Sequence, residues 1–163
     1  MSVPEILFLC TGNSCRSILA EAVLNGLARG RLHAESAGSH PRGAVHPRAL
    51  ALLRQEGFSI AGLASKSWDD LDRIPDIVIT VCARAAGEAC PAYLGPALRA
   101  HWGMDDPADV LGTEAEIEAA FVTTYRILRQ RIEALLELPV AQWLIEDPLR
   151  LRRELEHIGH DVP

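Results

Sequence analysis

The chain has 163 residues, of which 48% are apolar and 23% charged, and its formal net charge is −6. This composition predicts one soluble globular domain, large enough to bury a core. A negative net charge argues against nucleic-acid and membrane-surface partners, both of which favour a basic face. The N-terminal residues contain neither a signal sequence nor an apolar stretch of membrane-spanning length, so we expect a cytoplasmic protein.

Four short runs predict strands, at residues 5–9, 33–37, 76–81 and 98–102. The first and third are almost continuously apolar, which is typical of strands buried on both faces of a parallel sheet. Helices are expected between them, over Ser17–Arg29 and from Pro47 to a stop at Gly57. Strands that alternate with helices predict an α/β fold with a parallel sheet and helices on both of its faces.

The C-terminal third is expected to be helical. Thr113 and Glu116 form a capping box, and the long helix that follows stops before Pro139. A final amphipathic helix is expected over Pro148–Ile158, with Gly159 just after its end. We treat residues 1–163 as one domain that carries a helical extension from about residue 140.

The segment between the first strand and the first helix predicts an oxyanion site. It reads Cys10-Thr11-Gly12-Asn13-Ser14-Cys15-Arg16-Ser17. A loop in this position directs backbone N–H groups into one concavity, and the helix N-terminus adds positive charge. Gly12 and Asn13 tolerate the left-handed backbone that such a nest needs, and Arg16 can hold a tetrahedral oxyanion with two parallel hydrogen bonds.

Cys10 is the expected nucleophile of this loop. The positive field should lower the pKa of its thiol well below the free value of about 8.5, and the Ser17 hydroxyl can donate to the thiolate. The alternative is an inert buried cysteine in a glycine-containing turn. For Cys15 we expect a packing or redox-sensitive role rather than a catalytic one.

Asp106 is the candidate general acid. It precedes Pro107 after the fourth strand, and the carboxyl ends of parallel strands share one rim of the sheet. It could therefore reach the Cys10 loop and protonate a leaving oxygen. Two alternatives stay open, namely that Asp106 only initiates an Asp-Pro turn and that Asp105 is the acid.

Two further cysteines suggest disulfide exchange. Cys82 ends the third strand on the same rim, and Cys90 follows in an expected loop. A thiolate at Cys82 could attack Cys10, and Cys90 could then attack Cys82. The alternatives are apolar filling or zinc binding, although the short paired ligand spacing of a zinc site is missing.

These motifs resemble a known family. Together with Ser36-Ala37-Gly38 and with His101-Trp102-Gly103 before Asp106-Pro107, they look like arsenate reductases of the low-molecular-weight tyrosine-phosphatase fold. The resemblance implies a four-stranded sheet of order 2-1-3-4. It also implies that Cys10 attacks arsenate, that Arg16 and the loop amides hold the oxygens, and that Asp106 is the acid.

In the thioredoxin-coupled members of that family, the residues at Cys82 and Cys90 complete the reaction. Cys82 would attack Cys10 and release arsenite, Cys90 would then bond to Cys82, and thioredoxin would reduce the Cys82–Cys90 disulfide. The gap between these cysteines is one residue longer here than in those members. The resemblance leaves the reductant open among thioredoxin, glutaredoxin with glutathione, and mycothiol.

Some members also bind a potassium ion near the loop. Asn13, Glu21 and Ser36 match that site, but Ser65 stands where an acid is expected. We therefore predict no metal and no cofactor, and we expect a monomer without nucleic-acid or membrane partners.

Two rival functions share part of this pattern. A low-molecular-weight tyrosine phosphatase would use the same loop, arginine and acid, but such enzymes usually carry tyrosine after Asp-Pro, where this chain has Ala108. They also do not need Cys82 or Cys90. A non-catalytic anion-binding module would not need a thiolate.

Overall fold

The computed structural model describes residues 3–82 and 95–161, so Cys90 lies outside the described residues. Its centre is a sheet of four parallel strands, β1 (Glu5–Leu9), β2 (His33–Ala37), β3 (Ile77–Thr80) and β4 (Leu98–His101). The strand order is β2-β1-β3-β4. The α/β class, the parallel sheet and its order are therefore confirmed. Residues 6–9 are all buried, which explains why alternation is missing from their sequence.

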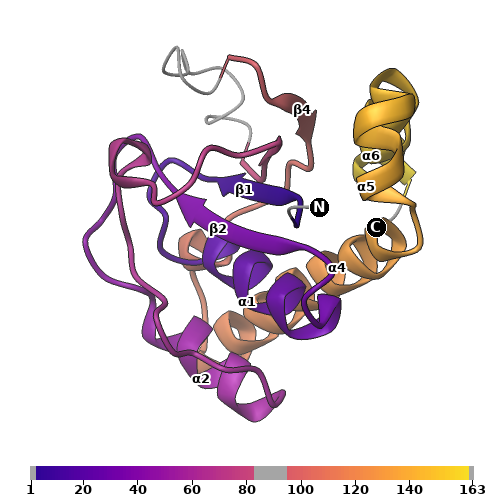
Figure 1. Cartoon of the computed structure of the whole chain (residues 1–163). Helices are drawn as coiled ribbons and strands as arrows, with labels where there is room; N and C mark the ends of the chain where they lie inside the picture. The colour runs from indigo at the N-terminus through magenta and orange to yellow at the C-terminus, as the bar shows by residue number, and fades with distance from the viewer. Residues whose placement is uncertain (1–2, 83–94, 162–163) are drawn as a thin grey trace.

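The helices are α1 (Arg16–Ala28), α2 (Pro47–Gln55), α4 (Glu114–Leu136), α5 (Val140–Glu146) and α6 (Pro148–Asp161), with 3-10 turns η1 (Trp68–Asp70) and η3 (Pro107–Asp109). In Figure 1, α1 and α4 lie together below the sheet, and α5 and α6 lie beside β4. None of the helices within residues 3–82 and 95–161 has the length and apolarity that crossing a membrane requires.

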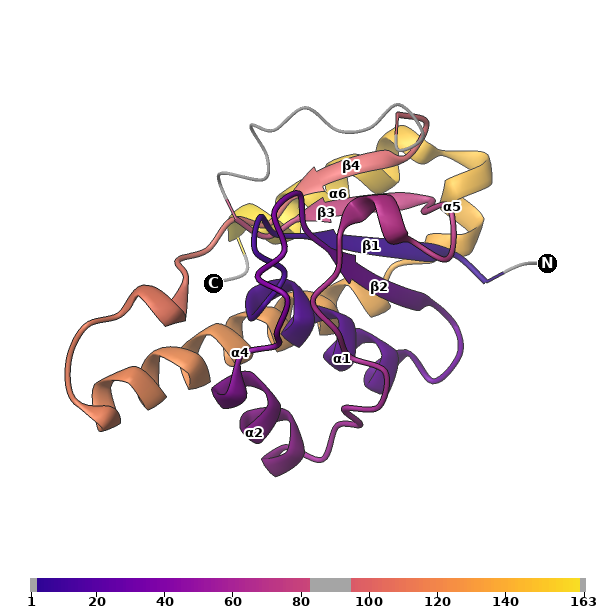
Figure 2. The same cartoon turned by 90° about the vertical axis from the view of Figure 1, so that its left-hand side faces the viewer.

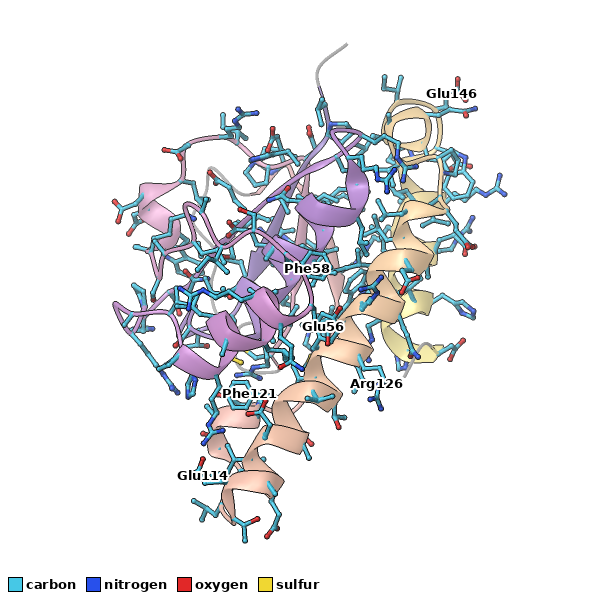
Figure 3. The ribbon with its side chains drawn as sticks, turned by 90° about the horizontal axis from the view of Figure 1, so that it is seen from below. Glu56, Phe58, Glu114, Phe121, Arg126 and Glu146 are labelled. Carbon is cyan, nitrogen blue, oxygen red and sulfur yellow. The ribbon has the colours of Figure 1, made fainter. Side chains whose placement is uncertain are left out.

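Helix α4 begins as its sequence predicts. The Thr113 side chain accepts the Glu116 N–H, and the Glu116 side chain accepts the Thr113 N–H, which completes the capping box. Figure 3 shows Phe121 between α2 and α4, where its ring packs on that of His46 at 4.8 Å between centroids. This contact fixes α4 beside the segment that leads into α2.

The expected end of the last helix is wrong, because α6 continues through Gly159 to Asp161. A Cβ on Gly159 would lie 2.5 Å from the His101 carbonyl oxygen and 2.6 Å from Cδ1 of Trp102. Glycine is therefore needed here for close packing of α6 on β4 and not for helix termination. The Trp102 indole N–H also donates to the Leu155 carbonyl at 2.8 Å.

The carboxyl ends of the strands form one rim. Leu9 of β1 pairs with Ala37 of β2 and with Thr80 of β3, and Thr80 pairs with His101 of β4. The loops that leave β1 and β2 consequently run side by side at one end of the sheet, as Figure 2 shows. Residues that follow all four strands can meet there.

Candidate active site

The loop after β1 has its carbonyl groups tied to the segment after β2. Backbone N–H groups donate from His40 to Thr11 (3.0 Å), from Arg42 to Gly12 (2.9 Å) and from His46 to Ser14 (2.9 Å). With the carbonyls turned outward, the loop can direct N–H groups inward. The first N–H groups of α1 add to these, because a helix offers them no internal acceptor. This is the backbone arrangement that an oxyanion site requires.

Asn13 supplies the left-handed residue of the loop, with φ of 42°. Its buried amide donates to the Ser17 hydroxyl oxygen at 2.8 Å and accepts the Lys66 N–H at 2.8 Å. Gly12 is not left-handed, contrary to expectation. Gly12 instead leaves room for the Arg42 side chain, because a Cβ there would lie 3.1 Å from Nε of Arg42.

Gly38, which follows β2, lies directly against the backbone of the loop after β1. A Cβ at this position would lie 2.4 Å from the Thr11 carbonyl oxygen and 2.5 Å from that of Cys10. No side chain fits at these distances, so glycine allows the two loops to approach closely.

A cavity of about 620 Å³ opens at this rim. It is lined by Cys10, Thr11, Gly12, Asn13, Ser14, Cys15, Arg16, His40, Arg42, Cys82, Met104, Asp105, Asp106 and Asp109. The lining joins the predicted loop from Cys10 to Arg16 with Cys82 and Asp106. Ser17 is not part of the lining and contacts Asn13 instead.

Arg16 extends from the first turn of α1 across the cavity. One terminal nitrogen donates to the Met104 carbonyl at 2.9 Å, and the other lies 3.3 Å from Oδ2 of Asp106. Its Nε is buried and has no hydrogen-bond partner among residues 3–82 and 95–161. An unpaired buried donor is costly, so the arginine holds a free N–H ready for an anion.

Asp106 caps the turn η3 and also lines the cavity. Its Oδ1 accepts the Ala108 N–H at 2.9 Å and caps η3, while its Oδ2 faces Arg16. The side chain is 13% exposed, whereas Asp105 is an exposed residue. Of the two candidates for the acid, only Asp106 combines burial with a contact to the oxyanion-binding arginine.

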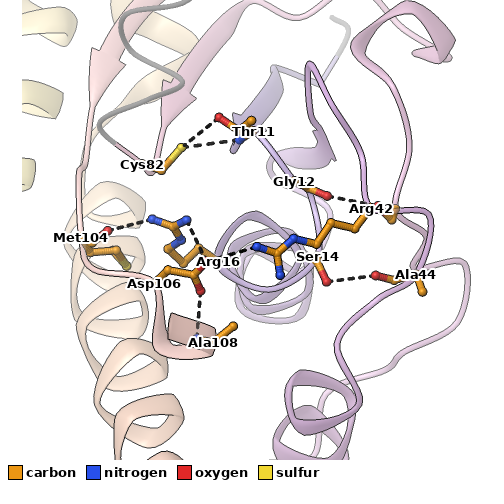
Figure 4. Close-up of polar contacts among 11 residues, drawn as sticks. Thr11, Gly12, Ser14, Arg16, Arg42, Ala44, Cys82, Met104, Asp106 and Ala108 are labelled. Carbon is orange, nitrogen blue, oxygen red and sulfur yellow. Dashed lines mark hydrogen bonds and ion pairs between the residues drawn. The ribbon is translucent and has the colours of Figure 1, made fainter. Parts of the chain in front are cut away.

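Cys82 lies against the loop that begins at Cys10. Its sulfur accepts the Thr11 N–H at 3.5 Å and is 3.7 Å from the Thr11 hydroxyl (Figure 4). The thiol of Cys82 also has the largest effect on the pKa of the Cys10 thiol. The structure thus brings together two buried sulfurs from residues far apart in sequence.

This thiol pair overturns the expected pKa of Cys10. The hydrogen bond with Cys82 and then burial raise the pKa of the Cys10 thiol, and these effects exceed the lowering by Arg16 and by the Gly12 N–H. The expectation of a lowered pKa is wrong for this arrangement, because it considered the loop without Cys82. Removing the effect of Cys82 takes away the largest cause of the raised pKa, so it makes ionisation of Cys10 easier.

Cys15 is a buried thiol in the same loop. Burial first, and then Asp106, raise the pKa of Cys15 to about 12, with Arg16 and Arg42 acting in the opposite direction. It therefore stays protonated at neutral pH and is a poor nucleophile.

The residues that match a potassium site do not fit such an ion. The Ser36 hydroxyl donates to Glu21 at 2.6 Å, and the Asn13 side-chain oxygen already accepts the Lys66 N–H. Burial raises the pKa of Glu21 more than the Ser36 hydroxyl and the Lys66 charge lower it. Ser65 offers a hydroxyl that donates to a loop carbonyl at 3.2 Å instead of a carboxylate. In the ranges that the structure describes, no three Asp, Glu, His or Cys side chains form a potential metal cluster.

Two features of the site were missed in the sequence. Arg42 lines the cavity, but its only sequence signal was a position in a Pro-Arg-Gly turn after the second strand. Arg131 of α4 is buried and donates to the Trp102 carbonyl at 3.1 Å, which supports the chain just before Met104 and Asp106. A long helix gives no signal that one of its arginines faces inward.

Comparison with known proteins decides the family. The model of the low molecular weight phosphotyrosine protein phosphatases matches residues 5–155. The chain belongs to this family. Within it, the chain is 38% identical to an arsenate reductase of Bacillus licheniformis, over 84% of this chain and 98% of the relative.

Solved structures of arsenate reductases agree with this result. An arsenate reductase in a phosphate-binding state matches with a TM-score of 0.69 and 26% identity, over 83% of this chain and 98% of the other. A thioredoxin-dependent arsenate reductase of Corynebacterium glutamicum matches with a TM-score of 0.57 and 32% identity, over 80% and 62%. The resemblance to arsenate reductases of the phosphatase fold is thus confirmed.

Proposed function

We propose that this member of the phosphatase family is an arsenate reductase that uses its own cysteines as electron donors. The observation that carries the proposal is the buried sulfur of Cys82, which accepts a hydrogen bond from Thr11 inside the oxyanion loop and lines the same cavity as Cys10. A phosphatase needs a single thiol at this position. A second thiol in contact with the first suits a reaction that ends in a disulfide.

The first step forms an arsenic adduct on Cys10. Arsenate binds to the loop N–H groups and to Arg16. The buried Nε of Arg16, which has no partner among the described residues, can donate to an arsenate oxygen. The Cys10 thiolate attacks arsenic, and Asp106 gives a proton to the oxygen that leaves as water. The Ser17 hydroxyl accepts from Asn13, which leaves its own proton available to stabilise the thiolate. Arsenic is still in the +5 state in this adduct.

The second step reduces arsenic. The Cys82 thiolate attacks the sulfur of Cys10, and a Cys10–Cys82 disulfide forms as the sulfur–arsenic bond breaks. The electron pair of that bond stays on arsenic, so arsenite leaves in the +3 state and the two cysteines are oxidised. Loss of the oxyanion then opens the cavity to the next thiol.

The last step restores Cys10. Cys90 attacks Cys82, a Cys82–Cys90 disulfide forms, and Cys10 leaves as a thiolate. An external thiol reductant, either thioredoxin or glutaredoxin with glutathione, then supplies two electrons and reduces this disulfide. The relative from Corynebacterium glutamicum, which is described as thioredoxin-dependent, supports thioredoxin as the first reductant to test. Such chemistry suits a cytoplasm in which thiols are kept reduced.

Arsenate turnover with each reductant supplied separately tests the proposal. We expect turnover by the wild type, and loss of turnover in each of the variants Cys10→Ser, Cys82→Ser and Cys90→Ser. Cys15→Ser is the matched control and should keep most of the activity. Loss in Cys10→Ser alone would contradict the cysteine relay. Efficient hydrolysis of phosphotyrosine without arsenate turnover under any reductant would contradict the reductase itself.

A further inference from the structure

Arg42 enters the cavity from the loop opposite α1. Its backbone N–H donates to the Gly12 carbonyl at 2.9 Å, so its main chain is fixed to the oxyanion loop. Ser65 strengthens this link, because its hydroxyl donates to the same carbonyl and accepts the Gly43 N–H. The Arg42 side chain is 56% exposed and lies over Gly12, where no side chain obstructs it. Because its backbone is fixed and its guanidinium is exposed, Arg42 is suited to contact an anion that enters the cavity.

Two arginines converge on one oxygen. Oδ2 of Asp106 lies 3.3 Å from Arg16 and 3.9 Å from Arg42, and Figure 4 marks both ion pairs with dashed lines. The distance of 3.9 Å makes the Arg42 contact a loose ion pair. The Asp106 carboxylate thus lies between two guanidinium groups, where a bound anion could also lie. Both guanidinium groups have N–H donors that the carboxylate does not use.

We propose that Arg42 is a second oxyanion-binding arginine, which exchanges Asp106 for the leaving oxygen of the bound oxyanion. This inference rests on the proposed function for the identity of the oxyanion. Asp106 is the group that would protonate the leaving oxygen, so a guanidinium next to its Oδ2 lies next to that oxygen as well. A bound oxyanion would compete with Oδ2 of Asp106 for the same guanidinium, and the loose contact of 3.9 Å allows Arg42 to turn to the substrate.

This position gives Arg42 a role in specificity. An inorganic oxyanion has a free oxygen at the leaving position, which can accept a hydrogen bond from Arg42. In an aryl phosphate the same oxygen carries a ring, which occupies the space of the guanidinium and replaces a charged acceptor by an ester. Arg42 therefore favours small inorganic oxyanions over phosphate monoesters.

The test compares oxyanion binding and turnover in Arg42→Gln, Arg42→Lys and the matched control Arg54→Gln, which removes an exposed arginine of α2. Binding of inorganic phosphate is measured by calorimetry on the Cys10→Ser background. Turnover is measured with arsenate and with p-nitrophenyl phosphate on the active enzyme.

For Arg42→Gln we expect the Kd of phosphate and the KM of arsenate to rise about tenfold, the size of one charged hydrogen bond. Arg42→Lys should recover part of this loss, and Arg54→Gln should match the wild type. The kcat/KM for p-nitrophenyl phosphate should stay within about twofold. An unchanged phosphate Kd, or an equal loss for both substrates, would overturn the role of Arg42. Because phosphate binding is measured without turnover, its result stands even if the wild type fails to reduce arsenate.

Discussion

The Cys82 sulfur accepts the backbone N–H of Thr11 at 3.5 Å, a hydrogen bond that joins residues 71 positions apart. It places a second thiol inside the loop that would hold the oxyanion, in contact with the thiol of Cys10. In the absence of substrate, Cys82 raises the pKa of the Cys10 thiol. The same contact places Cys82 where it could attack Cys10 after arsenate has reacted.

Removal of the Cys82 sulfur should make Cys10 more acidic. The hydrogen bond with Cys82 is the largest cause that raises the pKa of Cys10, so Cys82→Ala should lower that pKa and increase the thiolate fraction at neutral pH. The pH dependence of alkylation by iodoacetamide measures this directly, and its midpoint should move to lower pH. Cys15→Ala removes a neighbouring buried thiol and should leave the midpoint in place. An unchanged midpoint in Cys82→Ala would show that the contact does not control ionisation.

Asp106→Asn should separate the two roles of this residue. The amide oxygen can still accept the Ala108 N–H, so the cap of η3 is retained. The amide cannot donate the proton that the leaving oxygen needs, so kcat should fall by about 100-fold or more. Asp106→Ala also removes the cap and should cost about 1 kcal/mol more in the free energy of unfolding. Steady-state kinetics and urea denaturation give both quantities, and an Asn variant that retains wild-type kcat would exclude Asp106 as the acid.

Gly159→Ala should destabilise the protein even though alanine is the better helix former. The helix propensity of alanine contributes about 1 kcal/mol in its favour. Against this, the new methyl group would collide with the His101 carbonyl and the Trp102 ring, and overpacking of this kind costs about 1–3 kcal/mol. We expect a lower Tm for Gly159→Ala by calorimetry. For the exposed substitution Arg153→Ala, the free energy of unfolding should stay within about 0.5 kcal/mol of the wild type. A higher Tm in Gly159→Ala would show that α6 does not pack on β4 as described.

Exchange of potassium for sodium should have no specific effect. Glu21 already accepts the Ser36 hydroxyl, and the Asn13 side-chain oxygen accepts the Lys66 N–H, so the oxygens that match the site already have hydrogen-bond partners. The KM for arsenate and the Tm should be equal in potassium and sodium chloride of the same ionic strength. A lower KM or a higher Tm in potassium alone would contradict this assignment.

The fold could be predicted because its signals are local. The apolar run of β1 and the capping box of α4 each determine a structure within a few neighbouring residues. Gly159 shows where this fails. Its sequence position suits a helix end, but the contact that requires glycine comes from β4, more than fifty residues earlier.

The sequence predicts most residues of the site, but it predicts neither the raised pKa of Cys10 nor the position of Arg42. Cys10, Arg16, Cys82 and Asp106 follow strands of one parallel sheet, so topology alone brings them to one rim. The raised pKa of Cys10 depends on the orientation of the Cys82 side chain, which no local pattern specifies. Arg42 was missed for the same reason, because its function depends on a loop-to-loop contact.

A single turnover without external reductant tests most directly whether the protein supplies the electrons itself. Fully reduced enzyme, freed of all small thiols, is mixed with arsenate, quenched, and analysed for arsenite and for intact mass. The account predicts one arsenite per chain, the loss of two thiol hydrogens, and a disulfide that contains Cys82. Arsenite that appears only after an external thiol is added, with all cysteines still reduced beforehand, would contradict it.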